Sequence, residues 1–115
     1  MRLKAEIWVM AYVRRLNGMG VPAMVVRRGD DQAGAIYIKV NALDGRAMLF
    51  CPAPAGADMP EGERRWVRFF KDALVAEAQA DAALARERAF DPDIWIVEIE
   101  DRQCRHFLDD WLMDG

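Results

Sequence analysis

Apolar and polar positions alternate most clearly between Val21 and Phe50, and this pattern predicts three consecutive strands joined by tight connections. The apolar runs are short and rich in Val, Ile, Tyr and Phe, which suit a pleated, half-buried surface. The stretches GDDQAG and LDG separate the runs, and Asp with Gly is typical of hairpin turns. We therefore expect strands over 23–28, 36–41 and 46–51.

The faces of these strands follow from their alternation. Met24, Val25 and Val26 are all apolar, which predicts a central strand covered on both faces. The second strand alternates more strictly and should place its apolar side chains on one face and its polar ones on the other. The two faces of this strand are Ile36, Ile38 and Val40 against Tyr37, Lys39 and Asn41.

Two segments have the period of a helix. Residues 3–19 place one apolar stripe on the face that should meet the sheet, and Gly18 and Gly20 provide the stop. This stripe is Ala5, Trp8, Val9, Tyr12, Leu16 and Met19. A second stripe of Leu3, Ile7 and Met10 lies on the opposite side, and either the rest of the chain or a second subunit must cover it.

Residues 73–89 are good helix formers, with Asp72 placed as N-cap. Their predicted buried face is Leu74, Ala78, Ala82, Ala85 and Ala89.

The remaining segments complete an α+β domain that spans residues 1–115. Residues 64–70 and 93–100 alternate like strands, whereas 51–63 contain three prolines and read as a loop. Residues 105–113 predict a short C-terminal helix, with a strand over 105–108 as the alternative. The expected architecture is a mainly antiparallel sheet of about four to five strands with helices mainly on one face.

Charge is distributed unevenly along the 115 residues. Residues 1–71 carry 12 basic and 7 acidic side chains, and residues 72–115 carry 4 and 12, giving a net charge of −3. The two halves can attract each other within one fold or between neighbouring subunits. The acidic balance argues against a general nucleic-acid binder, and a weak nucleic-acid association remains the third alternative.

Cysteine usage and hydropathy bear on location. Cys51 and Cys104 have no CxxC spacing, which fits free thiols in a reducing cytoplasm. The longest apolar run is far shorter than the roughly 20 residues that span a bilayer, and no signal peptide is apparent. We expect a cytoplasmic protein without a membrane contact.

Candidate chemistry is limited to two clusters. Glu98, Glu100, Asp101 and the single histidine, His106, could bind a metal or transfer protons, but no HxH or HExxH spacing accompanies them. The second cluster is basic and could converge on an anion beside Tyr37; its members are Arg27, Arg28, Lys39, Arg64, Arg65 and Arg68. Ser and Thr are absent altogether, which excludes these residues as nucleophiles.

Several phrases along the chain carry a family resemblance: AYVRR, VVRRGDDQAGAIYIKVN, CPAPAG, RRWVR and ARERAFDPDIWIVEIEDRQCRHFLDD. Together they resemble a domain-of-unknown-function family of small alphaproteobacterial proteins, from about Met1 to Asp110. The resemblance implies a cytoplasmic bacterial protein. It implies no activity, cofactor or catalytic residue.

The leading hypothesis is a non-enzymatic binding or interaction domain that forms a homodimer, with Leu3, Ile7 and Met10 at the interface. The alternative is a small anion-binding or enzymatic domain. No catalytic residue, metal or cofactor is predicted. The candidate ligand-binding residues are Arg28, Tyr37, Lys39, Arg64, Arg65, Glu98, Glu100 and His106.

Overall fold

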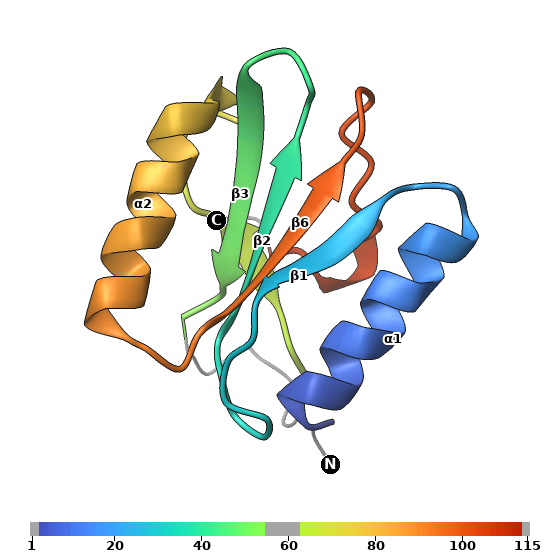
Figure 1. Ribbon diagram of the computed structural model, residues 1–115, viewed down its shortest axis with the longest axis vertical. Helices are drawn as coiled ribbons and strands as arrows, with labels where there is room; N and C mark the ends of the chain where they lie inside the picture. The colour runs from blue at the N-terminus through green and yellow to red at the C-terminus, as the bar shows by residue number, and fades with distance from the viewer. Residues whose placement is uncertain (1–2, 55–62, 114–115) are drawn as a thin grey trace.

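A six-stranded sheet lies between two helices in the computed structural model, which describes residues 3–54 and 63–113 (Figure 1). The α+β class is confirmed, although the sheet is mixed rather than wholly antiparallel. The elements in chain order are α1 (Ala5–Gly18), β1 (Ala23–Arg27), β2 (Ile36–Asn41), β3 (Arg46–Pro52), β4 (Trp66–Arg68), β5 (Val75–Ala76), α2 (Glu77–Phe90), β6 (Trp95–Glu100) and the 3₁₀ turn η1 (Asp109–Trp111).

The strand order is β1-β6-β2-β3-β4, with β5 paired to β3. The expected hairpin of β1 with β2 does not form, because β6 lies between these two strands, whereas β2 and β3 pair antiparallel as expected. β6 pairs in parallel with β2 and antiparallel to β1. Its position follows from its composition, since Trp95, Val97 and Ile99 are buried on one face and Ile94 and Ile96 on the other.

β1 is consequently an edge strand, not the central strand that its apolar run predicted. Ala23 is buried and Val25 is half-buried on the side of α1. On the opposite face Met24 and Val26 are 40% and 56% exposed. Three apolar neighbours in sequence thus reflect an open edge, where one face lacks a covering element.

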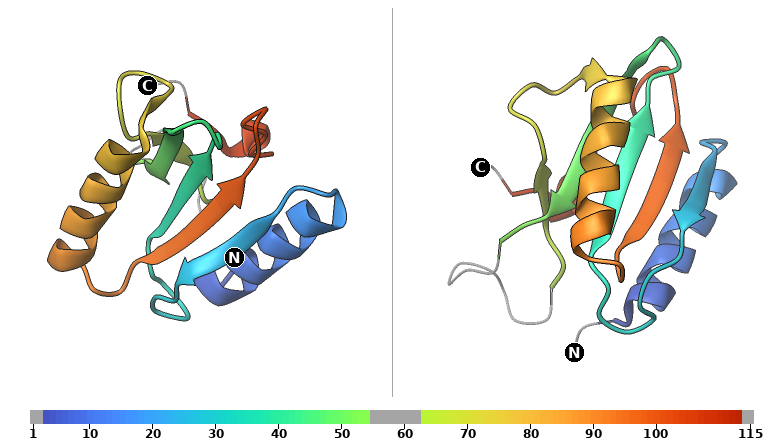
Figure 2. Two further views of the ribbon diagram at one scale, coloured as in Figure 1. Left: turned by 45° about the horizontal axis from the view of Figure 1, so that its top comes forward. Right: turned by 60° about the vertical axis from the view of Figure 1, so that its left-hand side comes forward.

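The two helices cover opposite faces of the sheet, which corrects the expectation of helices mainly on one face (Figure 2). α1 and the C-terminal segment bury the main core with Ile36, Ile38 and Val40, while α2 covers a smaller cluster around Leu49 and Ile96. The predicted inner face of α1 is buried except at its end, where Met19 is 44% exposed. Met19 lies beyond the last turn, so it has left the helical phase.

α2 begins at Glu77, four residues later than predicted, and Ala76 occupies the N-cap position in place of Asp72. The reason is a short strand pairing, since Val75 and Ala76 bond to Ala47 and Arg46 of β3 before the helix starts. The shift changes the buried face as well. It consists of Ala80, Ala83 and Leu84, not of the predicted alanine stripe.

The predicted C-terminal helix over 105–113 is reduced to the three-residue 3₁₀ helix η1, and the alternative strand over 105–108 does not form. Residues 101–108 form an irregular connection with positive φ at Cys104 (55°) and Phe107 (57°), and η1 follows. Leu108 is fully buried beneath it, and Leu112 forms a parallel bridge with Trp66. The segment therefore acts as a cap on the face that α1 leaves open. The predicted loop over 51–63 falls largely on 55–62, outside the described residues.

Candidate functional site

Lys39 is the centre of a buried ion cluster between the sheet and α2. Its side chain is 5% exposed, because β2 turns Lys39 toward the face that α2 covers. Nζ lies 2.8 Å from Glu77 Oε2 and 2.7 Å from Asp81 Oδ1, both on α2. Glu98 Oε1 of β6 is 3.3 Å away, since parallel pairing places Glu98 directly beside Lys39.

The cluster keeps Lys39 protonated. Burial lowers the pKa of Lys39, but the hydrogen bonds to Asp81 and Glu77 and the charge of Glu98 outweigh it, so the pKa is raised. The stability that these bonds provide is present below the ordinary lysine value and is lost only as the pH rises through the higher folded value. A lysine in this state is a structural cation and lacks the free amine that a base or nucleophile needs.

Polar neighbours on β2 extend the same layer. Asn41 Nδ2 donates to Glu77 Oε2 at 3.0 Å, and Asn41 Oδ1 accepts from the Leu43 N–H at 2.8 Å. Tyr37 donates its hydroxyl to Glu87 Oε2 at 3.3 Å. Burial, followed by the charge of Glu87, raises the pKa of Tyr37 to about 12. The candidates Tyr37 and Lys39 therefore join α2 to the sheet, and Glu98 pairs with Lys39 within the sheet.

His106 lies on the other side of the sheet from Glu98 and Glu100. Its ring packs edge-on against Phe50 at 4.9 Å between centroids, and its backbone oxygen accepts from the Tyr12 hydroxyl. Nδ1 accepts from the Leu108 N–H at 3.0 Å, which favours the neutral imidazole. The structure thus separates the histidine from the glutamates that were grouped with it. Among residues 3–54 and 63–113, no cluster of His, Cys, Asp and Glu forms a set of metal ligands.

The titration of His106 gives a testable expectation. Burial, with a smaller contribution from Arg68, lowers the pKa of His106 below its usual 6.5, while Asp109 opposes the shift. An NMR titration of this single histidine should therefore show a midpoint below 6.5. Replacing Arg68 with glutamine should raise the midpoint, and Asp109→Asn should lower it.

The lowered pKa of His106 also makes the stability of the fold depend on pH. A depressed folded pKa stabilises the fold above the unfolded value of about 6.5 and loses that contribution as the pH falls through the folded value. A midpoint at or above 6.5, or an Arg68→Gln variant that titrates lower, would contradict the burial and the charge environment described above.

The arginines lie in separate places. Arg28, in the β1–β2 connection, pairs with Glu6 and Asp31 and lies over the Trp95 ring at 5.1 Å. Just before β4, Arg64 donates to the Leu3 carbonyl oxygen at 2.9 Å. Arg65 donates to the Asp110 carbonyl oxygen and pairs with Glu63. These residues do not converge with Lys39 on one anion site.

Sequence reasoning missed the partners that hold these groups. Glu77 and Asp81 on α2 complete the Lys39 cluster, and Asp101, 8% exposed, is bound by Arg105 through Nε at 2.9 Å. The bond from Arg105 lowers the pKa of Asp101. The i,i+4 spacing of Asp101 and Arg105 was the sequence signal for this ion pair. It could not be recognised because the segment has no helical periodicity.

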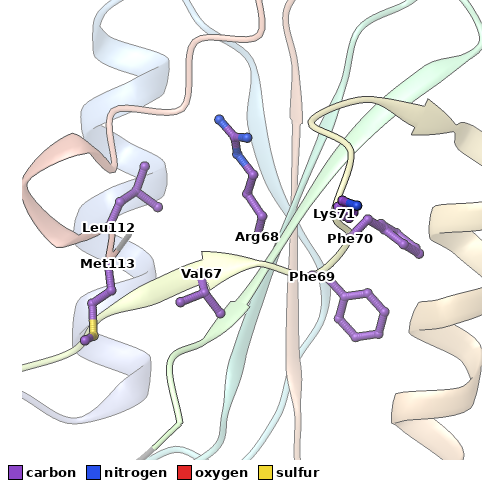
Figure 3. Close-up of a pocket in the computed structure, with 7 residues that line it drawn as sticks. All are labelled: Val67, Arg68, Phe69, Phe70, Lys71, Leu112 and Met113. Carbon is purple, nitrogen blue, oxygen red and sulfur yellow. The ribbon is translucent and has the colours of Figure 1, made fainter. Parts of the chain in front are cut away.

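A hollow of about 550 Å³ runs along the outer side of β4 (Figure 3). Arg68 rises from the strand between Leu112 on one side and Lys71 on the other, and Phe69 points the opposite way. The lining combines two cations with apolar side chains. Its residues are Val67, Arg68, Phe69, Phe70, Lys71, Leu112 and Met113.

The predicted interface stripe begins just before α1 and continues along the surface of that helix. Leu3, Ile7 and Met10 are 55%, 51% and 43% exposed. A second hollow of about 200 Å³ adjoins the stripe, because Leu3 also lines it together with Trp8, Ala11, Tyr12, Arg15 and Trp111. No helix in the described part of the chain combines the length and apolarity that crossing a bilayer requires.

Comparison with known families assigns the sequence to one of them. Residues 3–109 match the family model described as "Protein of unknown function (DUF1491)". The chain belongs to the DUF1491 family. The family description names no activity, and no curated protein matches the sequence.

Solved structures of similar bacterial proteins share the fold. A crystal structure of a family protein from Caulobacter crescentus CB15 has 40% identity and a TM-score of 0.80, covering 99% of this chain and 100% of that chain. An NMR structure of a Caulobacter family protein has 42% identity and a TM-score of 0.80, covering 99% of each chain. A solution structure of an A. tumefaciens protein, a structural genomics target, has 40% identity and a TM-score of 0.73, covering 87% and 86%.

Proposed function

We propose that this DUF1491 protein is a non-enzymatic interaction domain that works as a homodimer through the outer face of α1. The observation that carries the proposal is the exposed stripe of Leu3, Ile7 and Met10, which repeats about once per helical turn. Removing apolar surface from water contributes roughly 25 cal/mol per Å². A continuous apolar helix face is a common site of helix pairing.

A second copy suits this face because the face offers both a ridge and a hollow. The stripe is the ridge, and the hollow beside it has rigid aromatic walls. Trp8 stacks on Tyr12 at 4.7 Å and lies edge-on to Trp111 at 5.7 Å between ring centroids. A two-fold dimer requires one patch that complements itself. If the stripe of each copy lies next to the hollow of the other, the same contact is made twice and the patch complements itself.

Charge along α1 also favours an antiparallel pair. Glu6 and Arg14 lie four residues on either side of Met10. Pairing centred on Met10 brings Glu6 of each copy to the level of Arg14 in the other, so opposite charges face each other at both ends. Glu6 contacts Arg28 through Oε2, and Arg14 is exposed. Parallel pairing would place like charges at the same level.

A role in interaction, not catalysis, is supported by the polar side chains, because they are engaged in bonds within the fold. Lys39, Asp101 and Arg28 are each held in ion pairs within the fold, and His106 Nδ1 accepts a backbone hydrogen bond. A cytoplasmic setting is part of the proposal. It is supported by the bacterial relatives and by Cys51 and Cys104, which are both free thiols.

Light scattering after size exclusion tests the dimer. The unmodified chain at micromolar concentration should elute with twice the mass of one chain. Ile7→Glu places a charge within the apolar stripe, one turn from the pairing centre at Met10, and should weaken the dimer at least about tenfold, or about 1.4 kcal/mol. Circular dichroism should show that the variant remains folded, because the Ile7 side chain is 51% exposed.

Val26→Glu is the matched control, since Val26 is equally exposed, at 56%, but lies on β1. This variant should dimerise like the unmodified chain. A monomeric unmodified chain, or an Ile7→Glu variant that remains a dimer, would refute the proposal.

A further inference from the structure

β4 is the edge strand at the end of the sheet opposite β1, and the described C-terminal residues cover only part of its outer side. Leu112 forms a parallel bridge with Trp66, and the Met113 N–H donates to the Trp66 carbonyl oxygen at 2.9 Å. The C-terminal segment therefore already adds itself to this edge in the manner of an extra strand, at a single residue.

The next outward-facing residue of β4 is Arg68. The Phe69 N–H donates to Leu49, and the Arg65 carbonyl oxygen accepts from Ala53, so these two residues direct their backbone groups toward β3. Backbone groups alternate between the two sides of an antiparallel strand. The N–H and C=O of Arg68 therefore point the same way as those of Trp66, along the outer edge and beyond the bridge to Leu112.

The hollow described above lies on this edge (Figure 3). Arg68 and Lys71 are exposed, and neither forms an ion pair with the residues that the structure describes. Phe70 and Leu112, both half-buried, provide apolar surface beside the two cations. The site thus offers a strand edge, two positive charges and an apolar wall in one place.

We infer that the outer edge of β4 binds an extended acidic peptide segment of another protein as an added strand. Backbone hydrogen bonds to Arg68 give the segment its direction, and its carboxylates pair with the Arg68 and Lys71 side chains. Its alternate apolar side chains pack on Phe70 and Leu112. A small anion would engage the cations alone, whereas an extended peptide matches the backbone edge and the apolar lining of the hollow as well.

This site goes beyond the proposed homodimer and involves none of the α1 stripe. Its test uses a fluorescein-labelled peptide of alternating valine and glutamate, Gly-Val-Glu-Val-Glu-Val-Gly, with binding followed by fluorescence anisotropy. Saturable binding is expected, and Arg68→Gln and Lys71→Gln should each weaken it about three- to tenfold. Arg102→Gln removes an exposed cation elsewhere and should leave the affinity unchanged.

Two peptide controls separate strand addition from charge attraction. N-methylation of alternate residues blocks backbone donors without changing charge and should weaken binding at least about tenfold. Exchange of glutamate for lysine should abolish it. In amide NMR spectra, shifts should cluster at residues 66–71 and 112–113.

The inference is overturned by an absence of saturable binding, by equal affinity for the N-methylated peptide, or by shifts that cluster on β1, the other edge. Ile7→Glu should bind the peptide normally, so a failure of the dimer and a failure of this site are distinguishable.

Discussion

Replacing Lys39 with methionine is expected to lower the free energy of unfolding by about 3 kcal/mol. The substitution keeps most of the aliphatic stem and removes the ammonium group. Three carboxylates, from Glu77, Asp81 and Glu98, then lie close together without their shared cation. Removing one partner of a buried ion pair is costly because the remaining like charges repel one another and have lost the cation that compensated them.

The size of the effect depends on how much water those carboxylates retain. The side chains of Glu98, Glu77 and Asp81 are 19%, 35% and 56% exposed, so the loss falls at the lower end of the range for buried pairs. Urea unfolding followed by tryptophan fluorescence measures it. The deficit should shrink as the pH falls toward the carboxylate range near 4, because protonation removes the repulsion in the variant.

Two variants make this prediction specific. Lys71→Met removes an exposed lysine and should change stability by no more than about 0.5 kcal/mol. Glu98→Gln combined with Lys39→Met should recover part of the loss, since the two substitutions remove opposite members of one pair. If Lys39→Met were as stable as Lys71→Met, the cluster would contribute nothing to the attachment of α2.

Periodicity predicted the elements of this fold better than their arrangement. α1, β2, β3 and β6 lie where the apolar spacing placed them, and the inner faces of β2 and α1 were predicted from local pattern alone. The strand order was not, because pairing depends on contacts between segments far apart in sequence. β6 displaced β1 from the centre because Trp95, Val97 and Ile99 are buried on one of its faces, while Ile96 and the ion-paired Glu98 are covered on the other.

Contacts between distant segments also determine which candidate site residues lie together. Lys39 and Glu98 come together because β2 and β6 are parallel neighbours in register. His106 follows β6 by only a few residues, but the irregular connection carries it over the opposite face. Alternation correctly placed Lys39 on the polar face of β2 and could not show that α2 would bury it. The start of α2 depends on the pairing of β5 with β3, which no local propensity reveals.

Replacing Gly29 with alanine is the second change with a large expected effect, a loss of about 3 kcal/mol. A Cβ at Gly29 would lie 2.3 Å from the Asp93 carbonyl oxygen and 2.6 Å from the Ile94 carbonyl carbon. Both obstacles are backbone atoms, so no side chain can turn aside. The β1–β2 connection must move, and with it the Asp30 N–H that donates to Asp93 at 2.9 Å.

The loss of stability should extend to α1, because this connection also caps the N-terminus of that helix. The N–H groups of Ala5 and Glu6 donate to the carbonyl oxygens of Gln32 and Asp31 at 3.0 and 2.9 Å, in place of a side-chain N-cap. Moving the connection therefore weakens the first turn of α1 as well as the contact with β6. The Gly29→Ala variant should accordingly dimerise less well than the unmodified chain, in addition to unfolding at lower urea concentration.

Gly18→Ala is the control that isolates close approach from the general effect of removing a glycine. Gly18 is the last residue of α1, and a Cβ there would meet no atom within 4 Å. Alanine in that place should be neutral or stabilising by up to about 1 kcal/mol. If the change in unfolding free energy is negative for Gly29→Ala and positive for Gly18→Ala, the cost at Gly29 arises from the Asp93 and Ile94 backbone. Equal unfolding midpoints would instead mean that the β1–β2 connection does not press against β6 in solution, and the anchoring of α1 through Asp31 and Gln32 would lose its basis.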